Sequence, residues 1–256
     1  MNRMILAGAM LVASTAQAWD CDYTRDIEVA LDLKGSEVLS VVAGAGDLEI
    51  VGKRGAREAR AFGKVCASRE EWRDEAQILT ESGRTAEITV SLPNTESGWN
   101  VMGNRYVYMD LRVEVPDDIA LDVRDSSGDM KVEGTASVSI SDSSGGIDVE
   151  DVTGDVVLND SSGDIELLDI NGNVTVRQDS SGDIYGRDIQ GSVVVEKDSS
   201  GDIRFRDVRD DYIVERDSSG DIIAESVGGD FRVLRDSSGD IEARKVNGEI
   251  DIPRKG

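Results

Sequence analysis

A six-residue motif recurs along the second half of the chain at a nearly constant spacing. DSSGDI, or a variant with one substitution, begins at Asp125, Asp142, Asp160, Asp179, Asp198, Asp217 and Asp236. The successive spacings are 17, 18, 19, 19, 19 and 19 residues. A fixed period of this length is typical of repeat architectures, in which one structural unit stacks on the next.

Each period also contains a second, weaker turn, which divides it into two arcs. The period that starts at Gly172 reads GNVTVRQDSS and then GDIYGRDIQ, and apolar residues alternate with polar ones in both arcs. Such alternation is typical of half-buried β-strands, and an arc this short holds one strand and one tight turn. The sequence therefore predicts an all-β fold, a parallel β-solenoid (β-helix or β-roll like) with two short strands per coil of about 19 residues.

Stacking the coils in register would place equivalent apolar residues in rows inside the solenoid. The first row contains Met130, Ile147, Ile165, Ile184, Ile203, Ile222 and Ile241. In a second row Phe205 lies between Gly186 and Ala224, and these small neighbours leave space for its ring. Disordered acidic sequences lack apolar residues that keep one phase through every copy.

Residues 19–120 are less regular. AGAGDLEIVG at residues 43–52 is similar to the repeat corner, and TAEITVSLP and YMDLRVEVP alternate like strands. We expect irregular N-terminal coils over residues 19–120, regular coils over 121–256, and one continuous domain over 19–256. The segment SREEWRDEAQILT interrupts the alternation: Ser68 and Glu71 fit a capping box, and Trp72, Ala76 and Leu79 would share one helical face. We predict one short helix near residues 69–80.

The first 18 residues have the pattern of a cleavable signal peptide. Arg3 supplies a positive charge, MILAGAMLVA is apolar, and AQA ends at Ala18 with the small residues of a cleavage site. No segment is long and apolar enough to span a membrane as a helix. We expect an exported protein, cleaved after Ala18, that lies in the periplasm, outside the cell or at the cell surface.

The chain contains two cysteines. In an oxidising compartment Cys21 and Cys66 favour one disulfide, with two buried thiols as the alternative.

The formal net charge is −24, which repels nucleic acids and anionic lipids. We therefore expect no nucleic-acid partner, and the oligomeric state stays open.

The residues also carry a family resemblance. The segment VEVPDDIALDVRDSSGDMKVEG, followed by recurring SSGDI corners, resembles the bacterial putative-adhesin family of β-strand-repeat proteins, a domain of unknown function. It is similar, too, to the head domains of putative autotransporter adhesins. The resemblance implies an exported or surface-facing β-solenoid and carries over no catalytic residues. The aspartate before the serine pair departs from the family, in which a threonine or another small polar residue is expected.

The repeated corner has a structural interpretation and a cation-binding one. Glycine adopts turn angles that other residues resist, and Asp and Ser side chains bond nearby backbone N–H groups. Alternatively, stacking places the first aspartates in one file, here called the aspartate file: Asp125, Asp142, Asp160, Asp179, Asp198, Asp217 and Asp236. Carboxylates roughly 4.8 Å apart would repel one another. Calcium between coils could offset that repulsion, although known calcium β-rolls need GGxGxD and this motif has one glycine.

Basic residues offer another way to neutralise the file. They directly precede four of its members, at Arg124, Lys197, Arg216 and Arg235. The alternative function is therefore a calcium-binding β-roll whose folding depends on metal held by the file, for which Asp160, Asp179, Asp198, Asp217 and Asp236 are the candidate ligands. No other cofactor is expected.

Catalysis is not favoured. The chain contains no histidine to activate the corner serines, and a nucleophile repeated seven times has no chemical purpose. A Ser–Lys pair stays open, but the acids repeat at every corner without a distinct pair in a cleft. We therefore predict a non-enzymatic structural or adhesin-like binding module at the bacterial cell envelope, with an envelope polymer or a protein as its partner.

One irregular segment is the local candidate for recognition. Residues 97–108, SGWNVMGNRYVY, contain Trp99, Met102, Tyr106 and Tyr108, which are residue types favoured in contacts. An interior aromatic plug beneath a loop is the alternative for the same residues.

Overall fold

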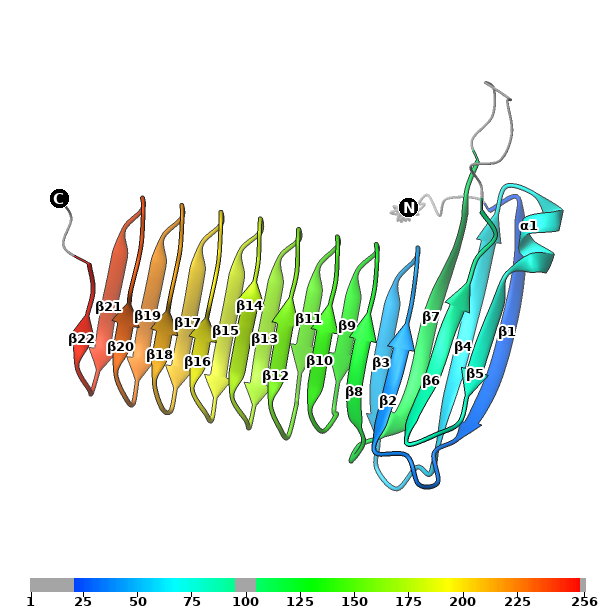
Figure 1. Cartoon of the computed structure of the whole chain (residues 1–256), viewed down its shortest axis with the longest axis horizontal. Coiled ribbons are helices and arrows are strands. Elements are labelled where there is room, and N and C mark those ends of the chain that lie inside the picture. Colours follow the sequence, from blue (N-terminus) through cyan, green and yellow to red (C-terminus); the bar gives the residue numbers. More distant parts are fainter. Residues whose placement is uncertain (1–20, 95–104, 254–256) are drawn as a thin grey trace, which may run out of the picture.

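The computed structural model describes residues 21–94 and 105–253, so the predicted signal peptide lies outside the described residues. The described chain folds into two sheets of 11 strands each, which face each other along an elongated stack of coils (Figure 1). The predicted all-β solenoid is confirmed.

The first sheet, sheet A, holds the strands that follow the DSSGD corners. Its strands, in spatial order, are β1 (Tyr23–Asp32), β4 (Glu58–Ala67), β7 (Val107–Pro116), β3 (Leu48–Lys53), β9 (Met130–Glu133), β11 (Ile147–Glu150), β13 (Ile165–Ile170), β15 (Ile184–Ile189), β17 (Ile203–Val208), β19 (Ile222–Val227) and β21 (Ile241–Val246).

The second sheet, sheet B, holds the strands of the other arc. Its strands, in spatial order, are β22 (Ile250–Asp251), β20 (Phe231–Val233), β18 (Tyr212–Val214), β16 (Val193–Val195), β14 (Val174–Gln178), β12 (Val156–Asn159), β10 (Val138–Ser141), β8 (Ala120–Arg124), β2 (Val38–Val42), β6 (Thr85–Ser91) and β5 (Gln77–Glu81).

Successive coils pair in parallel and in register, as the repeat predicts. Ile165 of β13 is the partner of Ile147 on one side and of Ile184 on the other, and Ile184 is in turn the partner of Ile203. Because the period of the sequence equals one coil, each apolar residue stacks on its equivalent in the next coil.

The stacked rows form one continuous core. Its isoleucines and valines are almost completely buried from Met130 through Val233. Aromatic rings of adjacent coils also pack together, with 5.2 Å between the ring centres of Phe205 and Tyr212 and 5.1 Å between those of Tyr212 and Phe231. A Cβ at Gly186 would overlap the Phe205 ring, which confirms the predicted pairing of large and small residues.

The N-terminal strands depart from the simple coil. β4 pairs antiparallel with both β1 and β7, and β5 pairs antiparallel with β6. Between these strands and the regular repeat, β2 and β3 form a stacked coil with parallel neighbours on both sides. The region expected to hold irregular coils therefore combines a coil with an antiparallel extension (Figure 1).

The helix is shorter than predicted. α1 spans Glu70–Glu75, and Gln77–Glu81 forms strand β5 instead of a second helical turn. The capping box is also wrong, because Arg69 is the N-cap and no side chain caps the helix. Trp72 and Ala76 are buried as expected, but Leu79 points outward from β5 and is 50% exposed. The alternation of buried Ile78 with Leu79 in a strand outweighs the helical spacing.

A disulfide ties the start of the described chain to the antiparallel extension. Cys21, which precedes β1, bonds to Cys66 near the end of β4, with an S–S distance of 1.97 Å and a Cα–Cα distance of 5.5 Å. Among the described residues, none of the helices has the length and apolar character that a membrane span requires.

Candidate functional site

The DSSGD corner joins each sheet B strand to the following sheet A strand, and its glycine makes the close stacking possible. Gly182 has a φ of 133°, a conformation that side chains disfavour. A Cβ at this position would also overlap the carbonyl oxygen of Gly163, one coil earlier. Only glycine therefore allows two successive corners to approach this closely.

The second serine of the corner bonds to the preceding coil. The Ser200 hydroxyl donates to the backbone carbonyl of Ser180 at 3.1 Å, and Ser219 donates to Ser199 at the same distance. These hydroxyls satisfy backbone oxygens at the turn, where the strand ladder has ended. The serines thus have a structural task in the corner.

The second aspartate of the corner forms an outer ladder. Asp164 Oδ1 accepts the N–H of Asp183 at 2.9 Å, Asp183 accepts that of Asp202 at 2.8 Å, and the series continues to Asp221 and Asp240. A matching ladder runs up the opposite corner through Asp155, Asn173, Ser192, Asp211 and Asp230. Each carboxylate therefore links two coils, a role that the sequence analysis did not identify.

The first aspartate, which forms the aspartate file, is buried inside the corner. The side chains of Asp179 and Asp198 are 0% exposed, and the members from Asp125 to Asp217 are at most 6% exposed. Some oxygens accept turn N–H groups, such as Asp179 Oδ1 from Ser181 at 3.3 Å. Both carboxylate oxygens of Asp125, Asp142, Asp160 and Asp198 are buried without a hydrogen-bond partner.

Burial changes the acidity of the file. Desolvation raises the pKa of Asp125 to about 7, that of Asp179 to about 6 and that of Asp198 to about 7. The same cause raises the pKa of Asp142, Asp160 and Asp217. Neighbouring file members add to the shift, because Asp160 raises the pKa of Asp179, and Asp179 that of Asp198.

The basic residues that precede the file do not neutralise it. The ion pairs of the described residues include none between a file carboxyl and Arg124, Lys197, Arg216 or Arg235. Arg124, for example, pairs with Asp122 at 2.7 Å. Adjacent residues of an extended chain point to opposite sides, so a residue beside a buried aspartate faces solvent. Within the described ranges, no group of three or more acidic or cysteine side chains is arranged to hold a metal ion.

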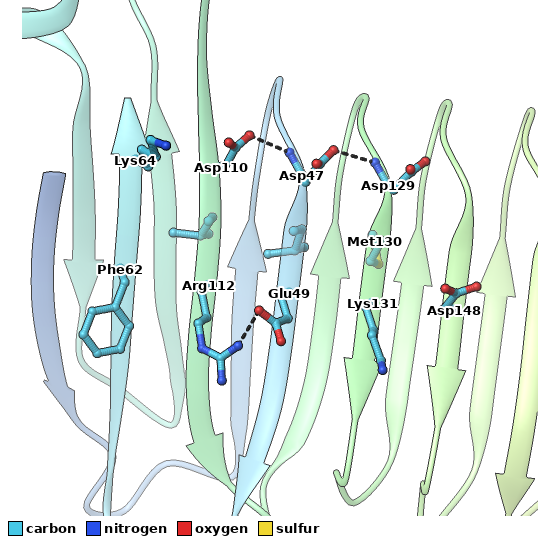
Figure 2. Close-up of a pocket in the computed structure, with 12 residues that line it drawn as sticks. Asp47, Glu49, Phe62, Lys64, Asp110, Arg112, Asp129, Met130, Lys131 and Asp148 are labelled. Atoms are coloured by element: carbon cyan, nitrogen blue, oxygen red, sulfur yellow. Dashed lines mark hydrogen bonds and ion pairs between the residues drawn. The ribbon is translucent and has the colours of Figure 1, made fainter. Parts of the chain in front are cut away.

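A second feature is a hollow on the outer face of sheet A, where the antiparallel extension meets the first coils. We call it the junction groove, and its volume is about 440 Å³. It is lined by Asp47, Leu48, Glu49, Phe62, Lys64, Asp110, Leu111, Arg112, Asp129, Met130, Lys131 and Asp148 (Figure 2). These residues come from β3, β4, β7, β9, β11 and the turns before them.

The groove carries charges of both signs beside an aromatic ring. Asp110 and Asp47 each accept a backbone N–H with one oxygen, from Asp47 at 3.2 Å and from Asp129 at 3.1 Å (Figure 2). Arg112 pairs with Glu49, and this contact raises the pKa of the guanidinium. Asp110, Asp47 and Asp129 form a short ladder of the same kind, which ends at Gly146, so one edge of the groove is acidic (Figure 2).

The aromatic segment predicted for recognition is only partly described. Trp99 and Met102 lie outside the described residues. Tyr106 and Tyr108 are half-buried, with 6.3 Å between their ring centres. The Tyr106 hydroxyl donates to Asp22 Oδ2 at 3.2 Å, and the Tyr108 hydroxyl lies 3.6 Å from Cys21 Sγ. These two tyrosines pack beside the disulfide and are neither a free surface patch nor an interior plug.

Sequence reasoning missed the junction groove because its residues are spread from Asp47 to Asp148 and come together only through strand order. The Gly-Asp corners at Asp47 and Asp129 both match the repeat, and they are the sequence feature from which this part of the groove could have been predicted.

These features define a class: a disulfide-tied β-solenoid with internally bonded corners and a mixed-charge groove near its N-terminal end. Within that class, the chain belongs to the Toastrack DUF4097 family, whose model matches residues 26–254. The predicted family resemblance to adhesin-like domains of unknown function is confirmed. No curated protein shows significant sequence similarity to the chain.

Several solved structures are similar over most of their length. A putative adhesin from Bacteroides fragilis NCTC 9343 is 13% identical, with a TM-score of 0.43 over 90% of this chain and 97% of that one. A putative lipid binding protein from Parabacteroides distasonis ATCC 8503 is 14% identical, with a TM-score of 0.40 and the same coverage. A putative cell adhesion protein from Clostridium sporogenes ATCC 15579 is 13% identical, with a TM-score of 0.31 over 90% and 99% of the two chains.

Proposed function

We propose that the protein is an exported, non-enzymatic binding module of the bacterial cell envelope, which holds an extended envelope polymer or a protein segment in the junction groove. The groove is the observation that carries the proposal. Carboxylates, cationic side chains and the Phe62 ring share one hollow there, and this is the mixture that hydroxyl- and amine-bearing ligands require.

The direction of the groove favours a long ligand. Asp110, Asp47 and Asp129 come from successive strands of sheet A, so they are spaced along the solenoid axis (Figure 2). Each uses one oxygen to accept a backbone N–H and can offer the other to a ligand. A polymer lying across the strands would meet an equivalent group at each coil, and the signal-peptide pattern would deliver the protein to such polymers.

A pair of matched variants tests this function. Arg112→Gln removes a groove charge, whereas Arg187→Gln makes the same change on an exposed part of β15 outside the groove. Binding is measured by co-sedimentation with isolated cell-wall polymer and, separately, by capture on immobilised envelope proteins. We expect Arg112→Gln to weaken binding severalfold and Arg187→Gln to leave it unchanged. Equal binding by both variants would reject the groove as the site.

Calcium binding by the aspartate file is the second candidate. The buried, unpartnered oxygens of Asp142, Asp160 and Asp198 are its support, because carboxylate oxygens are the ligands that calcium prefers, although no three acidic side chains of the described residues are grouped to hold a metal ion. A metal-dependent β-roll should lose tens of degrees of melting temperature in chelator and regain them with calcium. An unchanged melting temperature in both conditions would eliminate this alternative.

A further inference from the structure

The aspartate file combines three properties that are seldom found together. Its carboxyls are stacked one per coil, those from Asp125 to Asp217 are almost fully buried while Asp236 is half-buried, and no cation is paired with them in the described residues. An ionised carboxylate in such a place is strongly disfavoured, because it loses its hydration and gains no compensating charge. The carboxyls of the file must therefore either bind a cation or take up protons.

The groups around the file supply no positive charge. The neighbours that act on its carboxyls are the file members themselves, together with Asp47 near Asp125 and Asp164 near Asp179. On the sheet B side, the fully buried Tyr212 hydroxyl has no hydrogen-bond partner, and burial together with the charge of Asp217 raises its pKa. Among the described residues, the titratable groups that face the file are thus acidic or neutral, and the ionised aspartates disfavour ionisation of one another.

Asp198 and Asp217 show how the file can be satisfied. They belong to successive coils, and burial, then the charge of Asp179, then that of Asp217 raise the pKa of Asp198. Ionised carboxylates only accept hydrogen bonds, so a bond between two of them requires that one carries a proton. A protonated carboxyl can donate to a neighbour in the next coil, and each coil of the stack contributes one buried carboxyl from Asp125 to Asp217.

We propose that the aspartate file is a proton-binding site in which carboxyls of adjacent coils share protons taken from solvent, so that the solenoid is most stable at mildly acidic pH. The protonated file members donate O–H···O bonds along the interior of the corner. This inference does not depend on the ligand of the junction groove.

The sign of the pH effect follows from linkage. An unfolded aspartate loses its proton near pH 3.9, whereas folded Asp179 and Asp198 keep theirs to about 6 and about 7. Between these limits the folded chain holds more protons, so stability falls as pH rises. The contribution is fully present below pH of about 4 and lost above about 7; each such group changes the unfolding equilibrium up to about tenfold per pH unit.

Matched asparagine variants test the proposal. Asp198→Asn imitates the protonated carboxyl inside the file, whereas Asp183→Asn makes the same charge change on the exposed outer ladder and keeps Oδ1 as an acceptor. Thermal melting is followed from pH 5 to pH 8 in chelator. We expect Asp198→Asn to raise the melting temperature at pH 8 and to flatten its decline with pH, and Asp183→Asn to leave the decline as in the unchanged protein.

Equal pH dependence in both variants and the unchanged protein would overturn the proposal. A second measurement does not depend on whether Asp198→Asn folds: the unchanged protein is unfolded at pH 6 in weakly buffered denaturant and proton release is measured. Net release is expected, because the unfolded aspartates give up the protons that the folded file holds. Proton uptake, or no exchange, would contradict the proposal.

Discussion

Gly186 and Phe205 are neighbours in one interior row, and the absence of a side chain at one makes room for the ring of the other. We predict that Gly186→Ala destabilises the protein by about 1–3 kcal/mol through overpacking. Denaturant unfolding measures the change. Gly44→Ala is the control, since a Cβ there would meet only Leu92 at an ordinary distance of 3.7 Å.

The coupling between the two positions gives a sharper check. If the Phe205 ring is the cause, Phe205→Leu should restore part of the stability lost in Gly186→Ala, so the effects of the two changes should not add. If the effects of the two substitutions on the free energy of unfolding simply add, the Phe205 ring is not the cause of the destabilisation.

Residue types explain what could be predicted from the sequence and what could not. Ile165, Ile184 and Ile203 keep one chemical class and one phase, so their row was visible without a structure. The burial of the first aspartate was not, because aspartate is usually exposed and alternation does not tell which way a turn residue points. Asp169 and Asp188 were also missed: they adopt positive φ angles of 55° and 59°, which aspartate tolerates better than most residues.

At the scale of elements, local pattern was informative inside the repeat and weaker outside it. The helix near residues 69–80 ended early because β6 offers β5 a full set of antiparallel partners. The antiparallel pairing of β1, β4 and β7 depends on strand order, which no single alternating segment reveals.

The disulfide acts on this antiparallel extension. We predict that replacing both Cys21 and Cys66 by serine lowers stability by about 4 kcal/mol, the chain-entropy value for a loop closed across a separation of 45 residues. Calorimetry of the mature protein and the double variant provides the test. Hydrogen exchange should show the loss in β1 and β4, with β15 and β17 unaffected, and uniform loosening of all strands would contradict it.

The C-terminal coil is the most exposed part of the regular stack. Ile250 and Ile252 occupy positions equivalent to core residues, yet they are 48% and 40% exposed. We predict that amides of β20 and β21 exchange with solvent faster than those of β13 and β15, because a terminal coil is covered on one side only. Equal protection in a dilute sample would show that another surface covers this end.

At the scale of the whole molecule, one period of sequence corresponds to one coil; the second serine and the second aspartate of each corner bond to a neighbouring coil, and the glycine allows the corners to stack closely. The DSSGD motif therefore determines how successive coils stack. The junction groove lies at the N-terminal end, where the repeat becomes irregular. Repeating units of this kind contribute to stability as a sum of local terms and neighbour contacts.

Deletion of one period tests this central claim most directly. Removal of residues 179–197 joins Gln178 to Asp198 and takes out one complete coil, whereas removal of residues 179–189 brings two sheet B strands together with no sheet A strand between them. The full-period variant should melt cooperatively with unchanged strand signal in circular dichroism, and its longest dimension in X-ray scattering should shorten by roughly 4.8 Å. The partial deletion should lose cooperativity. Unfolding of the full-period variant, or equal tolerance of both deletions, would contradict the account.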